Sequence, residues 1–144
     1  SRMFDKVIVA VLVNSAKTPL FTVEERVAML RDACKNIPNV EIDSFNGLTV
    51  TFAKQKGATV MVRGLRAVTD FENEIQLAHT NFAMMPEIET VFLATAIKWS
   101  YLSSTIVKEA AYYGSDIGKF VTPNVEKAVN EKYALIRQKK DPET

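Results

Sequence analysis

Short apolar runs that alternate with helical patterns constrain the fold of this chain more than any other feature. The first run, Lys6–Val13, is apolar at every position after the lysine and rich in β-branched residues. Such a run is typical of a strand covered on both faces in a parallel sheet. Similar runs follow over Val40–Phe45, Thr59–Val62 and Glu89–Ala94, with helical segments between them. This order predicts an α/β fold with a doubly wound parallel sheet.

The helical segments carry their own start and stop signals. Thr22 and Glu25 have the spacing of a capping box, and so do Thr69 and Glu72. Gly57 stands where a glycine commonly ends a helix. The signals together predict helices over about 22–35, 48–56, 69–84, 103–113 and 123–139.

The beginning of the chain shapes our expectation about its completeness. Ser1–Phe4 resembles the last turn of a helix, which then gives way to the first strand. A parallel-sheet protein that opens in this way looks truncated, so we expect a strand and most of a helix to be missing. The 144 residues have the size of one domain, and we assign residues 1–144 to it.

Charge and composition argue against several classes of function. Eighteen basic and seventeen acidic residues leave a formal charge of +1, which argues against a nucleic-acid-binding surface. The sequence contains no apolar run long enough to span a bilayer and no signal peptide, so we expect a cytoplasmic protein. Cys34 is the only cysteine and His79 the only histidine, and both fit packing or surface roles better than catalysis.

Polar side chains gather in the loops that follow the predicted strands. The carboxyl ends of parallel strands share one edge of a sheet, where ligands bind. Cations and the hydroxyl-rich start of a helix at this edge would bind phosphate. The alternative is a solvated loop with two surface arginines and ordinary helix caps. The residues concerned are Lys17, Arg63, Arg66, Glu74, Lys98, Ser100, Ser103, Ser104 and Thr105.

Several kinds of chemistry lack a signature in the sequence. We find no catalytic serine triad, no nucleophile elbow, no P-loop and no dinucleotide fingerprint. Metal-ligand clusters are also absent from the sequence, so we assign no metal-binding residue. A divalent ion would arrive with the phosphates of a nucleotide. The remaining interpretation is phosphoryl or nucleotidyl transfer driven by positioning and charge neutralisation.

Four segments carry a family resemblance: Lys17–Arg26, Arg63–Glu72, Pro86–Phe92 and Trp99–Glu109. They resemble bacterial phosphopantetheine adenylyltransferase, of the nucleotidylyltransferase superfamily. The resemblance implies a Rossmann-like fold and transfer of the adenylyl group of ATP to 4′-phosphopantetheine, giving dephospho-coenzyme A and pyrophosphate. It also implies Mg²⁺ bound with ATP, a homohexamer, and coenzyme A as a feedback ligand.

The resemblance also implies roles for individual residues. Lys17 and Arg66 correspond to catalytic positions, and Lys17, Thr49 and Arg63 to positions that bind the phosphopantetheine substrate. The ATP-binding positions are Gly64, Leu65, Arg66, Glu74, Trp99, Ser100, Tyr101, Leu102, Ser103, Ser104 and Thr105.

Departures from the family pattern leave alternatives open. The family's N-terminal strand and its Gly-His pair, whose histidine stabilises the transition state, do not occur in this sequence. Thr49 and Phe82 also differ from common family residues and could alter pantetheine contacts. We therefore expect this chain by itself to be inactive and poorly stable. The alternatives are a non-catalytic nucleotide- or coenzyme A-binding regulator, and a related nucleotidyltransferase with another phosphorylated acceptor.

Overall fold

Strands and helices alternate along most of the chain, as the sequence predicts. The computed structural model describes residues 1–13 and 18–140. In order the elements are β1 (Val7–Val13), α1 (Val23–Cys34), β2 (Val40–Asn46), α2 (Thr49–Gln55), β3 (Val60–Leu65), α3 (Val68–Met84), β4 (Glu89–Ala94), the 3₁₀ helix η1 (Ile97–Trp99), α4 (Ser104–Tyr112) and α5 (Pro123–Lys140).

The four strands form two separate parallel pairs. β1 pairs with β2, with Val7 opposite Val40, and β3 pairs with β4, with Val60 opposite Glu89. Within the described residues no ladder joins the two pairs, so each is a two-stranded sheet. The α/β class with parallel strands is confirmed, but the expected continuous sheet is divided into two. The residues of a strand indicate that its free edge can form a hydrogen-bonded ladder. Whether a ladder forms depends on the position of a neighbouring strand in the folded chain.

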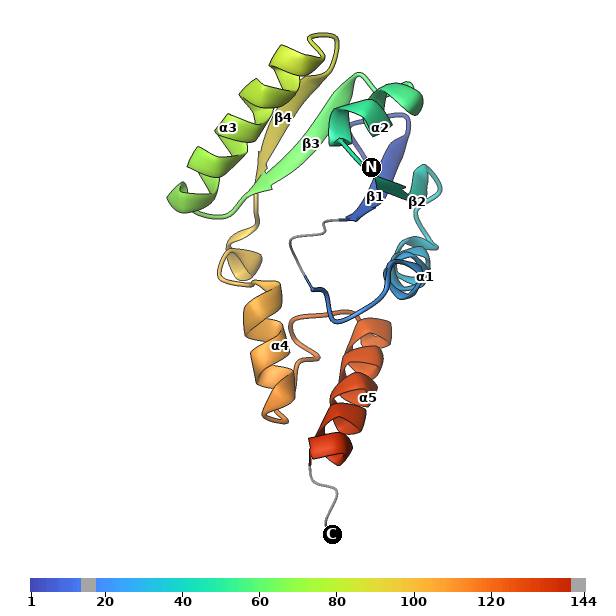
Figure 1. Ribbon diagram of the computed structural model, residues 1–144, viewed down its shortest axis with the longest axis vertical. Helices are drawn as coiled ribbons and strands as arrows, with labels where there is room; N and C mark the ends of the chain where they lie inside the picture. The colour runs from blue at the N-terminus through green and yellow to red at the C-terminus, as the bar shows by residue number, and fades with distance from the viewer. Residues whose placement is uncertain (14–17, 141–144) are drawn as a thin grey trace.

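A cleft separates the two sheets. Residues of β1, β3 and α2 line it, and Figure 1 shows where these three elements lie. Its volume is about 490 Å³. The N-terminal residues are tied down beside it, because the Asn39 side-chain amide donates to the carbonyls of Ser1 and Phe4 at 2.8 and 2.9 Å. Residues 2–5 form turns and bends there, so the expected helical turn over Ser1–Phe4 is wrong.

Two apolar cores stabilise the fold at different places. The first lies under α2 and combines Val50, Ala53, Met61 and Ile88. The second lies between α4 and α5, which Figure 1 shows side by side below the sheets. Its buried residues are Ala111, Ile117, Val129 and Tyr133, and Leu20 and Phe21 from the segment before α1 pack against them.

The predicted boundaries are confirmed in part. Thr22 caps α1 through a reciprocal pair, because Thr22 Oγ1 accepts from the Glu25 N–H while the Glu25 carboxylate accepts from the Thr22 N–H. Gly57 follows α2 with a φ of +67°, a conformation that favours glycine. The predicted cap at Thr69 is wrong, since α3 begins at Val68 after Ala67, which makes no side-chain capping bond.

Candidate functional site

Arg63 is held by a carboxylate of the next helix. β3 extends to Leu65, three residues further than the sequence predicts, so Arg63 lies inside the strand and not in the loop after it. Its Nε and Nη2 donate to Glu74 Oε2 and Oε1 at 2.6 and 2.7 Å. The pair is half-buried, with 40% of the Arg63 side chain and 19% of that of Glu74 exposed. The hydrogen bonds from Arg63 lower the pKa of Glu74, and those to Glu74 raise the pKa of Arg63.

Arg66 joins two segments that lie far apart in the sequence. Its Nε and Nη2 donate to Asp70 Oδ2 and Oδ1 at 2.9 and 3.1 Å. Its Nη1 donates to the Leu102 carbonyl at 2.5 Å. The guanidinium therefore lies between the first turn of α3 and the residue just before the N-cap of α4. The pairing lowers the pKa of Asp70 and raises that of Arg66.

The start of α4 presents hydroxyl groups beside this arginine. Ser103 is the N-cap, and its Oγ accepts from the Ile106 N–H at 3.2 Å. Ser104 and Thr105 follow in the first turn and are exposed. A helix N-terminus carries partial positive charge and favours anions. The expectation of a capped, hydroxyl-rich helix start is confirmed.

The loop between β4 and α4 is anchored to the end of β3. The Thr95 N–H donates to the Leu65 carbonyl at 2.9 Å. Within η1, Lys98 Nζ lies 5.0 Å from the centre of the Trp99 ring, a cation–π contact. The Ser100 hydroxyl donates to the Ile97 carbonyl at 2.9 Å, and the Tyr101 and Phe120 rings form a T-shaped pair. Trp99 is 39% exposed.

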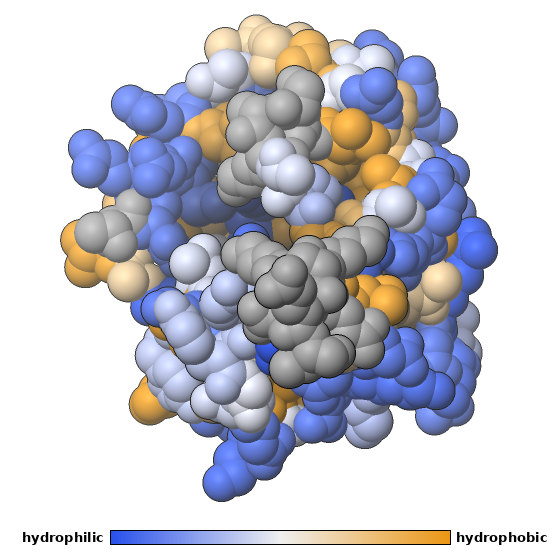
Figure 2. Space-filling view, turned by 60° about the horizontal axis from the view of Figure 1, so that its bottom comes forward, coloured by the Kyte–Doolittle hydropathy of each residue, from blue (hydrophilic) through white to orange (hydrophobic). Residues whose placement is uncertain are grey.

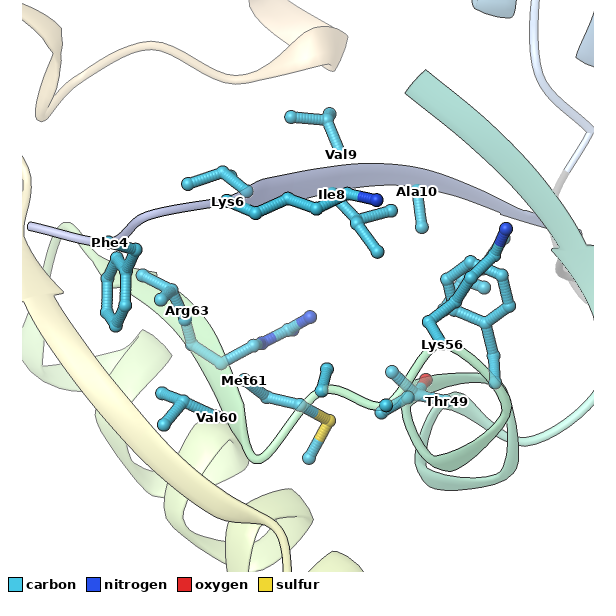
Figure 3. A pocket seen from close by; sticks show the side chains of 17 residues that line it. Phe4, Lys6, Ile8, Val9, Ala10, Thr49, Lys56, Val60, Met61 and Arg63 are labelled. Carbon is cyan, nitrogen blue, oxygen red and sulfur yellow. The ribbon is translucent and has the colours of Figure 1, made fainter. Parts of the chain in front are cut away.

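Thr49 and Arg63 line the same cleft between the sheets. Figure 3 shows Arg63 on the β3 side and Thr49 at the start of α2. Lys6 and Lys56 also line it, but both are engaged by acids of β2: Lys6 Nζ lies 2.6 Å from Glu41 Oε2, and Lys56 pairs with Asp43. The walls are otherwise apolar. Arg63, the third cation of the lining, is likewise paired, with Glu74.

The structure joins the two predicted segments 63–66 and 99–105 through the bond from Arg66 to Leu102. Lys17 lies outside the described residues. Gly64 and Leu65 form the end of β3, between Arg63 and Arg66. His79 is exposed on α3, and Cys34 is a half-buried free thiol at the end of α1.

Comparisons with known proteins agree on one family. The model of the Cytidylyltransferase-like family matches residues 1–110. A phosphopantetheine adenylyltransferase of Lachnoclostridium phytofermentans is 53% identical over 133 residues, which cover 92% of this chain and 82% of the relative. Proteins of the same name from a Nostoc and a Synechococcus species are 54% and 52% identical, over 87% and 94% of this chain and 65% and 85% of their own lengths.

The chain belongs to the phosphopantetheine adenylyltransferase family. Membership confirms the resemblance on which the residue roles were based. Arg66 joins the end of β3 to the segment just before α4. In a phosphopantetheine adenylyltransferase such a junction can serve a nucleotide, because cations and a helix N-terminus both favour phosphate.

Sequence reasoning missed the acid that fixes Arg66. Asp70 follows Arg66 by four residues, a spacing at which opposite charges meet when the chain is helical. Arg66 precedes α3, which begins at Val68, so this helical spacing rule does not apply to the pair and no local signal identified the partner. Sequence reasoning also assigned Glu74 to ATP alone and missed its bond with Arg63.

Across residues 1–13 and 18–140, no three histidine, cysteine or acidic side chains are grouped so that they could hold a metal ion. No helix in that part of the chain is both long and apolar enough to cross a bilayer. The acids nearest the arginines, Asp70 and Glu74, are already bound to them.

Proposed function

We propose that this protein transfers the adenylyl group of ATP to 4′-phosphopantetheine. A phosphate oxygen of 4′-phosphopantetheine attacks the α-phosphorus of ATP, the bond to the β-phosphate breaks, and pyrophosphate leaves. The products are dephospho-coenzyme A and pyrophosphate. Family membership supports this reaction, since the relatives are named for it.

The two substrates are both anionic, so the protein must offset their repulsion before they meet. Arginine is suited to this because its charge is permanent and its planar fork matches phosphate oxygens. We assign Arg63, Thr49 and Lys17 to the phosphopantetheine substrate, and Lys17 and Arg66 to stabilising charge that develops in transfer. The proposed ATP site comprises Gly64, Leu65, Arg66, Glu74 and residues 99–105 (Trp99, Ser100, Tyr101, Leu102, Ser103, Ser104 and Thr105).

The hydrogen bond from Arg66 to the Leu102 carbonyl carries this proposal. It brings the segment 63–66 into one site with the segment 99–105, which lies more than thirty residues later in the chain. A triphosphate could then contact a guanidinium and a helix N-terminus at once. The Thr95–Leu65 hydrogen bond supports the same arrangement.

A divalent ion fits this site only as part of the nucleotide. The side chains nearest the proposed phosphates are cationic, and their acidic partners are occupied by arginine. We therefore propose that Mg²⁺ is bound by the phosphates of ATP, where it would reduce their charge. This chain's own contribution is to orient the two substrates through Arg63, Arg66 and the start of α4.

Assembly, location and regulation are further parts of the proposal. Large apolar side chains are exposed on one half of the protein, notably Val62, Phe71, Phe82, Met84 and Leu93. Figure 2 shows patches of apolar side chains among hydrophilic ones on the face that it presents. Exposed apolar surface favours self-association, which supports a homo-oligomer. The homohexamer, the cytoplasmic location and feedback by coenzyme A rest on the family resemblance.

The decisive experiment measures pyrophosphate release. The natural full-length protein is incubated with MgATP and 4′-phosphopantetheine, and each substrate is omitted in turn. We expect release only when both are present, and a loss of at least about a hundredfold in Arg66→Ala. The variant should keep its melting temperature, because a half-exposed ion pair contributes little to stability.

Binding without pyrophosphate release would overturn the enzymatic proposal and favour a regulator that binds a nucleotide or coenzyme A. Release with a different phosphorylated acceptor would indicate another nucleotidyltransferase. Unfolding of Arg66→Ala would show that the arginine is structural, and the site would then be wrong.

A further inference from the structure

The pairing of Arg66 with Asp70 uses one whole edge of the guanidinium. The Nε and Nη2 atoms both bind the carboxylate, and the Arg66 backbone N–H lies 3.3 Å from Asp70 Oδ2 as well. A bidentate bond of this kind fixes the plane of the guanidinium as well as its position. Asp70 itself is fixed, because it belongs to the first turn of α3.

The orientation set by Asp70 directs the other edge of Arg66 to α4. Nη1 donates to the carbonyl of Leu102, which is the residue just before the N-cap Ser103. Three segments thus meet at one side chain: the end of β3, the start of α3 and the start of α4. Without Asp70, the guanidinium could rotate, and its bond to Leu102 would no longer be favoured over water.

We infer that Asp70 is a positioning residue for the nucleotide: it holds Arg66 in the orientation that joins the two halves of the ATP phosphate site. The inference rests on the proposed function. Asp70 does not touch the nucleotide in this account and acts only through Arg66. A negative charge beside a phosphate site would by itself repel ATP, so a net benefit from Asp70 requires that orientation outweigh repulsion.

Positioning of Arg66 and repulsion of ATP have opposite effects on affinity. The direction in which one substitution changes ATP affinity therefore distinguishes between them. In Asp70→Asn the negative charge is removed while the size of the side chain is kept. If repulsion dominates, the variant binds ATP more tightly. If positioning dominates, it binds ATP more weakly, and we expect the dissociation constant to rise about tenfold, the usual effect of losing a charge-assisted hydrogen bond.

The experiment is calorimetric titration of the full-length protein with MgATP and, separately, with 4′-phosphopantetheine. Four proteins form a cycle: the parent, Asp70→Asn, Arg66→Ala and the double variant. Asp32→Asn is the matched control, because Asp32 has an exposed bond to Lys35 on α1, on the other half of the molecule. Asp70→Glu tests whether a carboxylate on a side chain longer by one methylene restores ATP binding.

Support requires three results together. ATP binding weakens about tenfold in Asp70→Asn while binding of 4′-phosphopantetheine stays unchanged, which a general loss of structure would not produce. The Asp70→Asn effect vanishes in the Arg66→Ala background, because the residue acts through that arginine. Asp70→Glu recovers part of the affinity.

Other results overturn the inference or the proposal beneath it. Unchanged or tighter ATP binding in Asp70→Asn would contradict the positioning role and leave the proposed function intact. The same holds if Asp70→Asn weakens ATP binding equally in the Arg66→Ala background. Unchanged ATP binding in Arg66→Ala means that Arg66 is not part of the nucleotide site. In that case the proposed ATP site fails together with the inference.

Discussion

Two regions of the protein are held in place by different means. The arginine segment, residues 63–74, is fixed by acids that lie four and eleven residues from their arginines. The α1–α5 clasp joins residues about a hundred positions apart: Lys132 Nζ lies 2.8 Å from Glu25 Oε1, and the Asn124 amide donates to the Met29 carbonyl at 3.0 Å. The ion pairs of the arginine segment span at most eleven residues, whereas the contacts of the clasp join distant parts of the chain.

The two regions also differ in what surrounds the polar contacts. The arginine segment is half-exposed, and its ion pairs contribute little to the free energy of unfolding. The clasp lies beside the core of α4 and α5, in which Ile117 is completely buried. The arginine segment therefore orients charge, while the clasp and the core beside it supply stability and hold the chain that enters α1.

The largest effect on the free energy of unfolding is expected from a cavity in the core between α4 and α5, beside the clasp. Ile117→Ala removes most of a side chain with no exposed surface and should lower the free energy of unfolding by about 3 kcal/mol. The measurement is urea unfolding. The control is Leu135→Ala on α5, where 58% of the side chain is exposed and the change should be below about 0.5 kcal/mol. Equal losses in the two variants would show that the α4–α5 core does not dominate stability.

A smaller effect is expected for the polar part of the clasp. Lys132 also lies 5.5 Å from the centre of the Phe21 ring, so Lys132→Met loses an ion pair and a cation–π contact but keeps an apolar stem. We expect the melting temperature to fall by only about 2 °C. Lys127→Met is the control, because its bond to Glu131 is long and exposed. A loss as large as that of Ile117→Ala would contradict the division between polar clasp and apolar core.

The smallest effect concerns the pH dependence of the arginine segment. Arg63 lowers the pKa of Glu74 below its ordinary value of 4.5 in the folded protein. The pair therefore contributes its full stability above that value and loses it as the pH falls through the lowered pKa. Glu74→Gln should lose stability less steeply than the parent between about pH 5 and about pH 3, by less than about 1 kcal/mol.

Urea midpoints at several pH values test this prediction, with Glu131→Gln on α5 as the control. Parallel pH profiles for the parent and Glu74→Gln would mean that the Arg63–Glu74 pair has no net effect on stability. The arginine segment would then differ from the clasp even more sharply than we propose.

Local sequence signals determined much of this protein. The apolar runs gave four strands in the right places, and the Thr22–Glu25 spacing gave the capping box of α1. Such signals succeed because their physical cause, a side-chain period or a bond three residues away, lies within the segment itself. The Arg63–Arg66 string and the residues around Trp99 likewise indicated a phosphate site and one family.

Tertiary structure alone decided how these parts meet. It divided the strands into two sheets, since the pairing of an edge depends on a partner that no local pattern identifies. It engaged Arg63 with Glu74, and it directed Arg66 through Asp70 to the Leu102 carbonyl. A charged side chain has several possible partners along the sequence, and only the packing of α3 and α4 beside β3 selects among them.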